Sequence, residues 1–297
     1  SFLASPEFLS TTLHIITIIS LPIHIFGFYC ILFKTPKKMK SVKWSLLNLH
    51  FWSALLDLYL SFLTIPYLFF PVLAGYPLGL LSYLGVPTSI QIYIGVTILG
   101  VVAVSIILLF ENRHNSLVNI NNKFRIWKWI RILYLILNYI LAVLFFLPVF
   151  LLIPEDQEAA KLKLKKYPCP PPEFFDEPNF FVLAIDSNYF VISIVFLILI
   201  VILQIIFFVS LIFYYLKILK NSTMSKKTRK LQKKFFIALC IQVSIPILVI
   251  LIPLIYLVFS IIFGYYNQAL NNLAIIIISL HGLLSTIVML LVHKPYR

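Results

Sequence analysis

Long stretches without a charged residue are the feature that most restricts the fold of this sequence. Five such stretches occur, and only Asp57 interrupts them. A charge at the centre of a bilayer costs roughly 2.5–3.5 kcal/mol on insertion scales, and a membrane-spanning helix needs about 20 apolar residues. Apolar residues make up 61% of the chain and charged residues only 11%, too apolar for a soluble domain. The stretches therefore predict helices that cross a membrane.

The lengths of the stretches predict seven spans. The first, third and fourth stretches hold one span each, and the second and fifth hold two. We expect a turn at Ala74–Gly79 within the second stretch, and a break near Gly264 and the polar segment Asn267–Asn272 within the fifth. The predicted spans, forming one receptor-sized domain over residues 1–297, are 8–33, 44–73, 86–110, 129–153, 187–216, 235–263 and 272–292.

Two other structural classes fit less well. Buried helices of a soluble protein would not reach bilayer length seven times in succession, and residues 245–263 lack the alternating polarity of a membrane strand. The net charge of +14 is concentrated in short clusters between the apolar stretches. Such clusters are typical of membrane loops, so no nucleic-acid partner is expected.

The distribution of charge predicts an orientation. One set of loops carries 20 of the 24 basic residues and only Glu111 as an acid, whereas the other carries four lysines and eight acids. The positive-inside rule places the first set in the cytosol, which puts the N-terminus outside and the C-terminus inside. The sequon at Asn221 then lies on the cytosolic side, where it stays unmodified.

The ends and the cysteines support further expectations. A basic segment before the first apolar stretch is missing, so a cleaved signal peptide is not expected, and both native termini are expected to extend beyond this sequence. Cys30 and Cys240 fit the role of small packing residues. Cys169 lies on the oxidising side, and two interpretations remain open: a disulfide with a cysteine of a longer N-terminus, or a free thiol.

Asp57 is the only acid inside a predicted span, close to the middle of the membrane. Acids at this depth usually face the bundle interior and mark a functional site. We expect Asn48 on the same face of the helix. A switch linked to water or Na⁺ and a plain hydrogen bond to neighbouring helices remain equally open.

Glu111 and Arg113 end the third predicted span at the cytosolic side. An acid and an arginine at this place can lock helix ends together until a partner binds. The alternative is an arginine that anchors the helix end at lipid headgroups.

Other polar groups and prolines in the spans are candidates for switching or binding. Pro246 and Pro253 each remove a helix hydrogen bond from the sixth span, which makes it a candidate moving element or a static kink. His281 and Ser285 share one face of the seventh span. The residues nearest the outer side could line a small-molecule pocket, although hydrogen bonding between helices explains each of them too: Gln91, Tyr93 and Tyr256.

Several functions are excluded by what the sequence lacks. Phosphate-binding glycine loops, nucleophile elbows and metal-site spacings are missing, so neither an enzyme nor a cofactor is expected. The seventh span contains no lysine that could hold retinal.

The chain closely resembles the nematode serpentine chemoreceptors of the Srh class over essentially its whole length. The likeness rests on residues 5–61 and on the segments AGYPLG, VPTSIQ, FENRHN, IPEDQEAAK, PCPP and HGLLSTIVMLLVHKPYR. It implies a rhodopsin-like bundle of seven helices that binds an odorant and activates a heterotrimeric G protein. It also implies a place in the membrane of the sensory cilia of chemosensory neurons.

The chain departs from the rhodopsin-type pattern at three places. Glu111-Asn112-Arg113 replaces an acid-arginine-aromatic triplet, His293–Arg297 replaces a closing Asn-Pro-x-x-Tyr, and Ser244 replaces a tryptophan two residues before Pro246. These differences leave the activation mechanism open.

The leading hypothesis is therefore a chemosensory receptor. Its basic segment would flank the G-protein groove and touch anionic lipid; it contains Lys226, Lys227, Arg229 and Lys230. The alternative is a ligand-gated channel or transporter, although a transporter usually shows two matching halves and several charges at mid-membrane.

Overall fold

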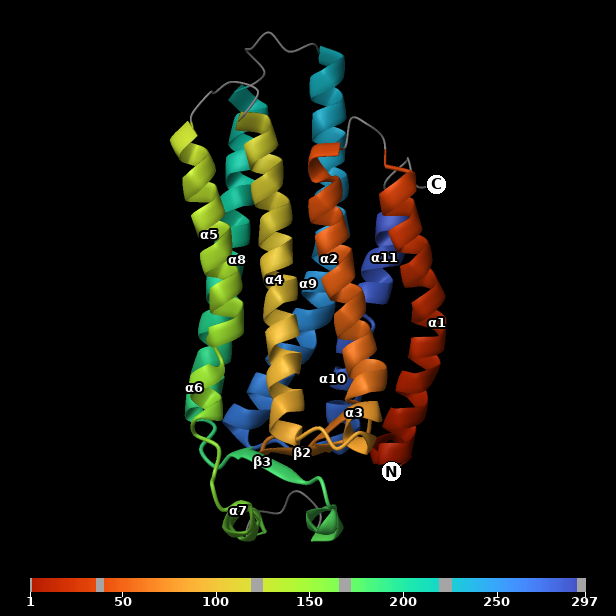
Figure 1. The fold of residues 1–297 in the computed structure, drawn as a ribbon, viewed down its shortest axis with the longest axis vertical. Helices are drawn as coiled ribbons and strands as arrows, with labels where there is room; N and C mark the ends of the chain where they lie inside the picture. Colours follow the sequence, from red (N-terminus) through yellow and green to blue (C-terminus); the bar gives the residue numbers. More distant parts are fainter. Residues whose placement is uncertain (1, 36–39, 119–124, 166–171, 219–225, 293–297) are drawn as a thin grey trace.

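Seven long apolar helices form one bundle in the computed structural model of this chain (Figure 1). The structure describes residues 2–35, 40–118, 125–165, 172–218 and 226–292. Within these, the helices long and apolar enough to cross a membrane are Pro6–Phe33, Val42–Leu63, Thr88–Val118, Lys128–Phe150, Asn188–Lys217, Lys230–Phe263 and Gln268–Val292. The predicted bundle of seven helices is thereby confirmed.

The secondary-structure elements have these bounds. The helices are η1 (Phe2–Ala4), α1 (Pro6–Phe33), α2 (Lys40–Leu58), the π-helix η3 (Tyr59–Leu63), α3 (Leu80–Tyr83), α4 (Thr88–Val118), α5 (Arg125–Leu144), α6 (Leu147–Phe150), α7 (Gln157–Leu164), η4 (Pro172–Asp176), α8 (Asn188–Ile218), α9 (Lys226–Phe263), α10 (Gln268–Ser279) and α11 (His281–Val292). The strands are β1 (Pro66–Leu68), β2 (Leu73–Pro77) and β3 (Phe181–Ala184). Helix α4 packs against α2, α5 and α8, and α11 packs against α1, α2 and α9.

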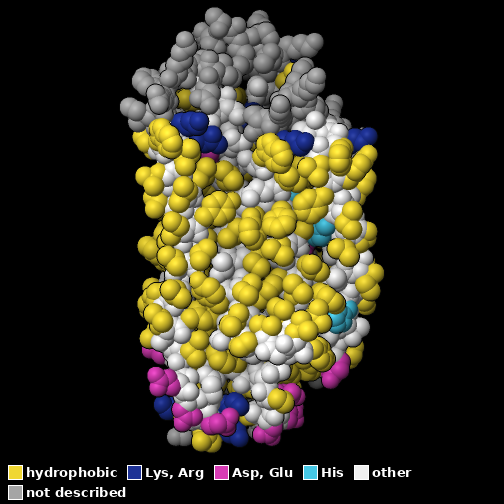
Figure 2. All heavy atoms as spheres, in the orientation of Figure 1, with side chains coloured by type: hydrophobic (Ala, Val, Ile, Leu, Met, Phe, Trp, Pro, Cys, Tyr) yellow, Lys and Arg dark blue, Asp and Glu magenta, His cyan; other side chains and the backbone are white. Residues whose placement is uncertain are grey.

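The outer surface of the bundle is apolar, as a lipid-facing surface has to be. Figure 2 shows a broad hydrophobic band, with Lys and Arg visible at both ends and most of the visible Asp and Glu at the lower end. In α8 only 11% of the most apolar 18 residues are buried in the protein, so most of its leucine, isoleucine and phenylalanine side chains face outward. We call the two ends the basic end and the sheet end.

Local sequence signals set the start of two spans. The Ser5 hydroxyl accepts a hydrogen bond from the Phe8 amide (3.1 Å) and Pro6 occupies the first turn, a combination that begins α1. The Asn267 side chain accepts from the Leu270 amide (3.2 Å) and begins α10. The polar segment Asn267–Asn272 is therefore the first turn of the seventh span, rather than a break outside it.

A small antiparallel sheet closes one end of the bundle, which the sequence did not predict. Strand β2 lies in the middle: its Tyr76 pairs with Tyr67 of β1, and its Ala74 pairs with Val182 of β3. Ala74–Gly79, predicted to be a turn, therefore supplies most of the central strand. Figure 1 shows the sheet lying across the lower ends of the helices, with α7 beyond it.

The predicted span boundaries differ most from the structure at three places. The second span ends at Leu63 instead of residue 73, because Ile65 adopts a positive φ of 46° and Pro66 lacks the amide that a helix needs. The third span continues from residue 110 to Val118, because its polar residues find partners inside the bundle. The sixth begins at Lys226, so the predicted basic loop is the first turn of α9.

Candidate functional site

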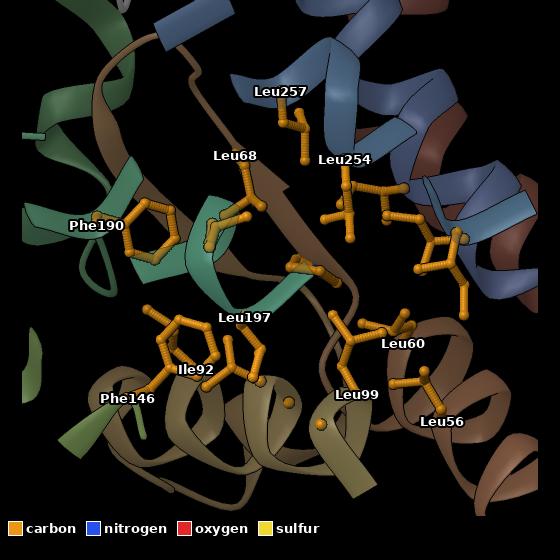
Figure 3. Close-up of a pocket in the computed structure, with 18 of the residues that line it drawn as sticks. Leu56, Leu60, Leu68, Ile92, Leu99, Phe146, Phe190, Leu197, Leu254 and Leu257 are labelled. Atoms are coloured by element: carbon orange, nitrogen blue, oxygen red, sulfur yellow. The ribbon is translucent and has the colours of Figure 1, made fainter. Parts of the chain in front are cut away.

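An apolar cavity of about 310 Å³ lies inside the sheet half of the bundle. Helices α2, α4, α8, α9 and α10 and all three strands line it, and Figure 3 shows leucine, isoleucine and phenylalanine side chains from several elements around it. Its labelled wall residues include Leu56, Ile92, Phe190 and Leu254. A mostly apolar pocket near this size is typical of small-molecule sites.

Only one of the three predicted pocket residues lies at this cavity. Gln91 is part of the wall. The Tyr93 hydroxyl instead donates to the Val143 carbonyl of α5 (2.7 Å). The Tyr256 hydroxyl donates to the Asn271 side-chain oxygen of α10 (2.9 Å). These two tyrosines connect helices, which was the alternative interpretation.

The amide of Gln91 has one satisfied and one unsatisfied end. Its Nε2 donates to the Val86 carbonyl oxygen (2.9 Å), and because a carbonyl can only accept, this bond fixes which end of the amide is nitrogen. The Oε1 atom is buried and has no hydrogen-bond partner among the described residues. The Tyr59 hydroxyl donates to the backbone oxygen of Gln91 (2.6 Å) and holds this turn against η3.

A buried polar cluster surrounds Asp57 on the other face of α2. Both carboxylate oxygens are inaccessible to solvent. Oδ1 accepts from His281 Nδ1 (2.7 Å) and the Gly282 amide (3.1 Å), and Oδ2 accepts from the Leu283 amide (2.7 Å) and His24 Nε2 (3.2 Å). Helix α11 thus begins with its free amides directed at a carboxylate, where the helix dipole favours a negative charge.

Four N–H groups donate to the Asp57 carboxylate. They favour the interpretation that Asp57 hydrogen-bonds neighbouring helices over the interpretation that it is a switch linked to Na⁺. His281 Nδ1 also contacts the Ile278 carbonyl (2.9 Å), and because both neighbours only accept, this nitrogen carries a proton. The described residues contain no group of three or more metal-ligating side chains suited to a metal ion.

Two further residues extend the Asp57 cluster. The Thr286 hydroxyl lies 3.3 Å from both His24 Nδ1 and His50 Nδ1, and His50 Nε2 lies 3.0 Å from the His24 carbonyl. Thr286, rather than the predicted Ser285, supplies the hydroxyl on this side of α11. The three histidines are scattered in the sequence, and the fold brings them together.

Two glycines allow the helices around Asp57 to approach so closely. A Cβ atom on Gly282 would lie 2.7 Å from Asp57 Oδ2 and 2.7 Å from the Ser53 carbonyl. A Cβ atom on Gly27 would lie 2.7 Å from a ring carbon of His50. Both positions lack room for any other residue, and they are the sequence signal that could have indicated a close contact of α1, α2 and α11.

Asn48 does not belong to the Asp57 cluster, contrary to the prediction. Nine residues correspond to two and a half helical turns, which places Asn48 and Asp57 on opposite faces. Asn48 Nδ2 donates to the Ser105 hydroxyl (2.8 Å) and to the Tyr139 hydroxyl (2.9 Å), and so connects α2 with α4 and α5. His50, seven residues before Asp57, is the side chain on the shared face.

The acid and the arginine near the basic end of α4 bind different helices. Glu111 forms a salt bridge with Arg131 of α5 (2.7 Å), and Arg131 also donates to the Asn112 side-chain oxygen (2.9 Å). Arg113 is only 4% exposed and donates to the Gln232 side chain of α9. The predicted lock thus has two parts, from α4 to α5 and from α4 to α9.

Arg113 is a buried cation without a paired acid among the described residues. Its Nε has no hydrogen-bond partner among the described residues, and its guanidinium lies 4.9 Å from the centre of the Phe235 ring. A cation over an aromatic face is stabilised by the ring quadrupole. Gln232 and Phe235 both belong to α9, so the position of Arg113 depends on where this helix lies.

Other predicted residues have simpler surroundings. Pro246 and Pro253 are buried within a continuous α9. Lys230 is exposed, and the side chains of Lys226, Lys227 and Arg229 lie outside the described residues. Cys30 and Cys240 carry free thiols, and Cys169 lies outside the described part.

Aromatic side chains pack around the sheet, between the bundle and α7. Tyr67 and Phe69 have no exposed surface, and Tyr76, Phe174 and Phe180 pack around them with ring centres 5.1–6.3 Å apart. Burial raises the pKa of the Tyr67 and Tyr76 phenols above their usual value, and nearby acidic groups add to this effect. Both phenols stay neutral at physiological pH.

Comparisons with known proteins agree with this geometry. Residues 4–297 match the family model of the serpentine type 7TM GPCR chemoreceptor Srh. The chain is 41% identical over 310 aligned residues to the Caenorhabditis elegans protein named serpentine receptor class H-72, covering 100% of this chain and 85% of that protein.

Proposed function

This chain belongs to the Srh family of serpentine seven-transmembrane chemoreceptors, and from that premise we propose that it binds a small molecule in the apolar cavity and activates a heterotrimeric G protein at its basic end. The family is one of membrane receptors and not of enzymes. The observation that carries the proposal is a cavity between α4, α8 and α9 in the same bundle as an arginine that connects α4 with α9 at the opposite end.

Helix α9 is the proposed moving element. Its residues Ile247, Leu254 and Leu257 line the cavity, and Gln232 on the same helix holds Arg113. A ligand shifts a conformational equilibrium only when it binds one packing more tightly than the other. We propose that the occupied cavity favours a packing in which the basic end of α9 moves away from Arg113 and opens a groove for the Gα subunit.

The charge distribution supports the proposed orientation. The basic end, with Lys128 and Lys230 exposed, faces the cytosol in this proposal, and the acidic sheet end faces outward. The first turn of α9, with Lys226, Lys227 and Arg229, would meet anionic lipid and the G protein. The receptor would act in the membrane of sensory cilia.

Ligand-dependent G-protein activation in cells that express the full chain tests this proposal. We expect a ligand from an odorant screen to activate the G protein, and we expect Arg113→Ala to abolish the response at equal surface expression. The matched control is Lys128→Ala, which removes an exposed positive charge at the same end and should leave the response unchanged.

Two results would contradict the proposal. Normal signalling by Arg113→Ala would remove the proposed role of that residue. A ligand-gated current through a membrane that contains only this protein, without any G-protein response, would replace the receptor mechanism by a channel.

A further inference from the structure

The wall of the cavity specifies the chemistry of what can occupy it. No described residue lining it carries a charge, and nearly all its side chains are aliphatic or aromatic. We propose that the ligand is an uncharged, largely apolar molecule with a neutral hydrogen-bond donor that Gln91 Oε1 accepts. This inference rests on the proposed receptor function, because it names the ligand class of the same site.

A charged ligand is excluded by the cost of its dehydration. An ammonium or carboxylate group placed among Leu56, Phe146 and Leu254 would lose its water shell without gaining an opposite charge. Burial of an unpaired ion is far more costly than burial of a hydroxyl or an apolar chain. The buried charges of Asp57 and Arg113 already have partners in the protein.

The sheet supports a dry cavity. Strand residues Leu68, Leu73 and Phe181 form part of its wall, and the fully buried Tyr67 and Phe69 pack at the sheet. An ordered water needs about two to four polar partners, so a cavity with so few favours apolar molecules.

Two polar side chains of this wall, Gln91 and Thr64, have a buried atom without a hydrogen-bond partner among the described residues, and Gln91 supplies an acceptor of fixed orientation. Its Nε2 is held by Val86, so its orientation is fixed before a ligand arrives, and its buried Oε1 has no donor within the described residues. A buried acceptor without a partner is costly, and a ligand hydroxyl would remove that cost. An alcohol should therefore bind more tightly than the alkane of equal length.

Four eight-carbon probes test the ligand class: 1-octanol, octane, octanoate and octylammonium. Each is added to the purified full chain in nanodiscs of neutral lipid, and the rise in its thermal unfolding temperature is measured against probe concentration. We expect saturable stabilisation by 1-octanol, weaker stabilisation by octane, and half-saturation at least about tenfold higher for both ions. Equal or stronger stabilisation by either ion would overturn the proposal.

Variants on one helix separate the cavity from the surrounding lipid. Ile92→Trp fills the cavity and should abolish the stabilisation by 1-octanol, whereas Ile94→Trp adds the same bulk at a position that is 37% exposed on the outer surface and should leave it unchanged. Gln91→Met should reduce binding of 1-octanol to the level of octane. Equal responses of the two tryptophan variants would overturn the assignment to this cavity, even if Gln91→Met does not fold.

The binding assay contains no G protein, so the two proposals can fail separately. Selective stabilisation by neutral probes without any cellular signalling would leave the ligand class standing and overturn the coupling. If a charged ligand activates signalling in cells and Ile92→Trp does not impair this response, the coupling would stand and the proposed ligand class would be overturned.

Discussion

Leu56 and Asp57 are neighbours in sequence, yet they belong to two regions of opposite character. Leu56 faces the apolar cavity, where side chains surround empty space. Asp57 faces α1 and α11, where two imidazoles and two backbone amides occupy its carboxylate. Helix α2 therefore separates two regions. On one side, fixed hydrogen bonds hold the Asp57 carboxylate, and on the other side, the cavity wall makes almost no directional contacts.

The difference indicates how the bundle divides its tasks. A buried network of hydrogen bonds in a low dielectric holds one geometry, because any displacement leaves polar groups without partners. An apolar wall has no such penalty and adjusts to the shape of what it contains. The Asp57 cluster should set the relative positions of α1, α2 and α11, and the cavity should change with its ligand.

The largest expected effect comes from removal of the carboxylate itself. Asp57→Ala leaves two imidazoles and two amides without their acceptor and should lower the free energy of unfolding by about 3–5 kcal/mol. Leu60→Ala, on the cavity face of the same part of the chain, is the control and should cost less. Thermal unfolding of both variants in nanodiscs measures the difference, and equal losses would remove the distinction between the two regions.

Substitutions of two glycines compare how tightly the Asp57 cluster and the cavity wall are packed. Gly282→Ala places a Cβ atom 2.7 Å from Asp57 Oδ2 and should cost about 1–3 kcal/mol through overpacking. Gly95→Ala adds the same atom to the cavity wall, 3.2 Å from a ring carbon of Tyr59, which borders empty space. Its unfolding temperature should stay close to that of the original chain. A larger loss at Gly95 would mean that the cavity wall is as rigid as the Asp57 cluster.

A substitution at Gln232 tests the connection that α9 makes between the cavity and Arg113 at the basic end. Gln232→Ala removes the side-chain hydrogen bond between Arg113 and α9, leaving the contact with Phe235, and should raise ligand-free nucleotide exchange on the G protein by up to about tenfold, equivalent to about 1.4 kcal/mol. The control, Gln204→Ala, removes another glutamine contact between helices, from α8 to Tyr134 of α5, and should leave basal activity unchanged. An unchanged or lower basal exchange in Gln232→Ala would contradict a restraining role for this bond.

The smallest expected effect is a pH dependence at the sheet. The pKa of Tyr67 is raised in the folded chain by burial and then by its acidic neighbours, so the unfolded chain loses this proton first, near pH 10. This phenol therefore adds no pH dependence to the stability well below pH 10, and above pH 10 it lowers the stability by at most about 1.4 kcal/mol at pH 11. Tyr67→Phe should make the unfolding free energy flatter between pH 9 and 11. An unchanged slope would show that this phenol is not protected.

Much of the fold follows from the sequence because a bilayer imposes one strong rule. Charge-free stretches of about 20 residues become spans, and this rule found all seven helices. It says nothing of segments at the membrane edge, where Pro66 and Ile65 end the second span early and Ala74–Gly79 pairs as a strand. Pairing between β2 and β3 joins residues more than a hundred positions apart, which local pattern does not reveal.

The candidate sites were predictable only in part, for a related reason. Asp57 stood out because it is an isolated charge, and Gln91 because it is polar near the end of a span. The partners His24, His50 and His281 come from three different helices, so their proximity depends on how the helices rotate and pack. The same holds for Arg113, whose partner Gln232 lies 119 residues later.

The aliphatic wall of the cavity has a consequence for how such a gene can change over generations. Codons for leucine, isoleucine, valine and phenylalanine interconvert by single-base changes, and volume-conserving swaps among apolar side chains usually cost less than about 1.5 kcal/mol. A duplicated copy can therefore acquire a new internal contour one tolerated step at a time. At Asp57, Gly27 and Gly282, by contrast, no such gradual path exists, so a lineage of these proteins should diversify its chemical repertoire while inheriting the scaffold that surrounds it.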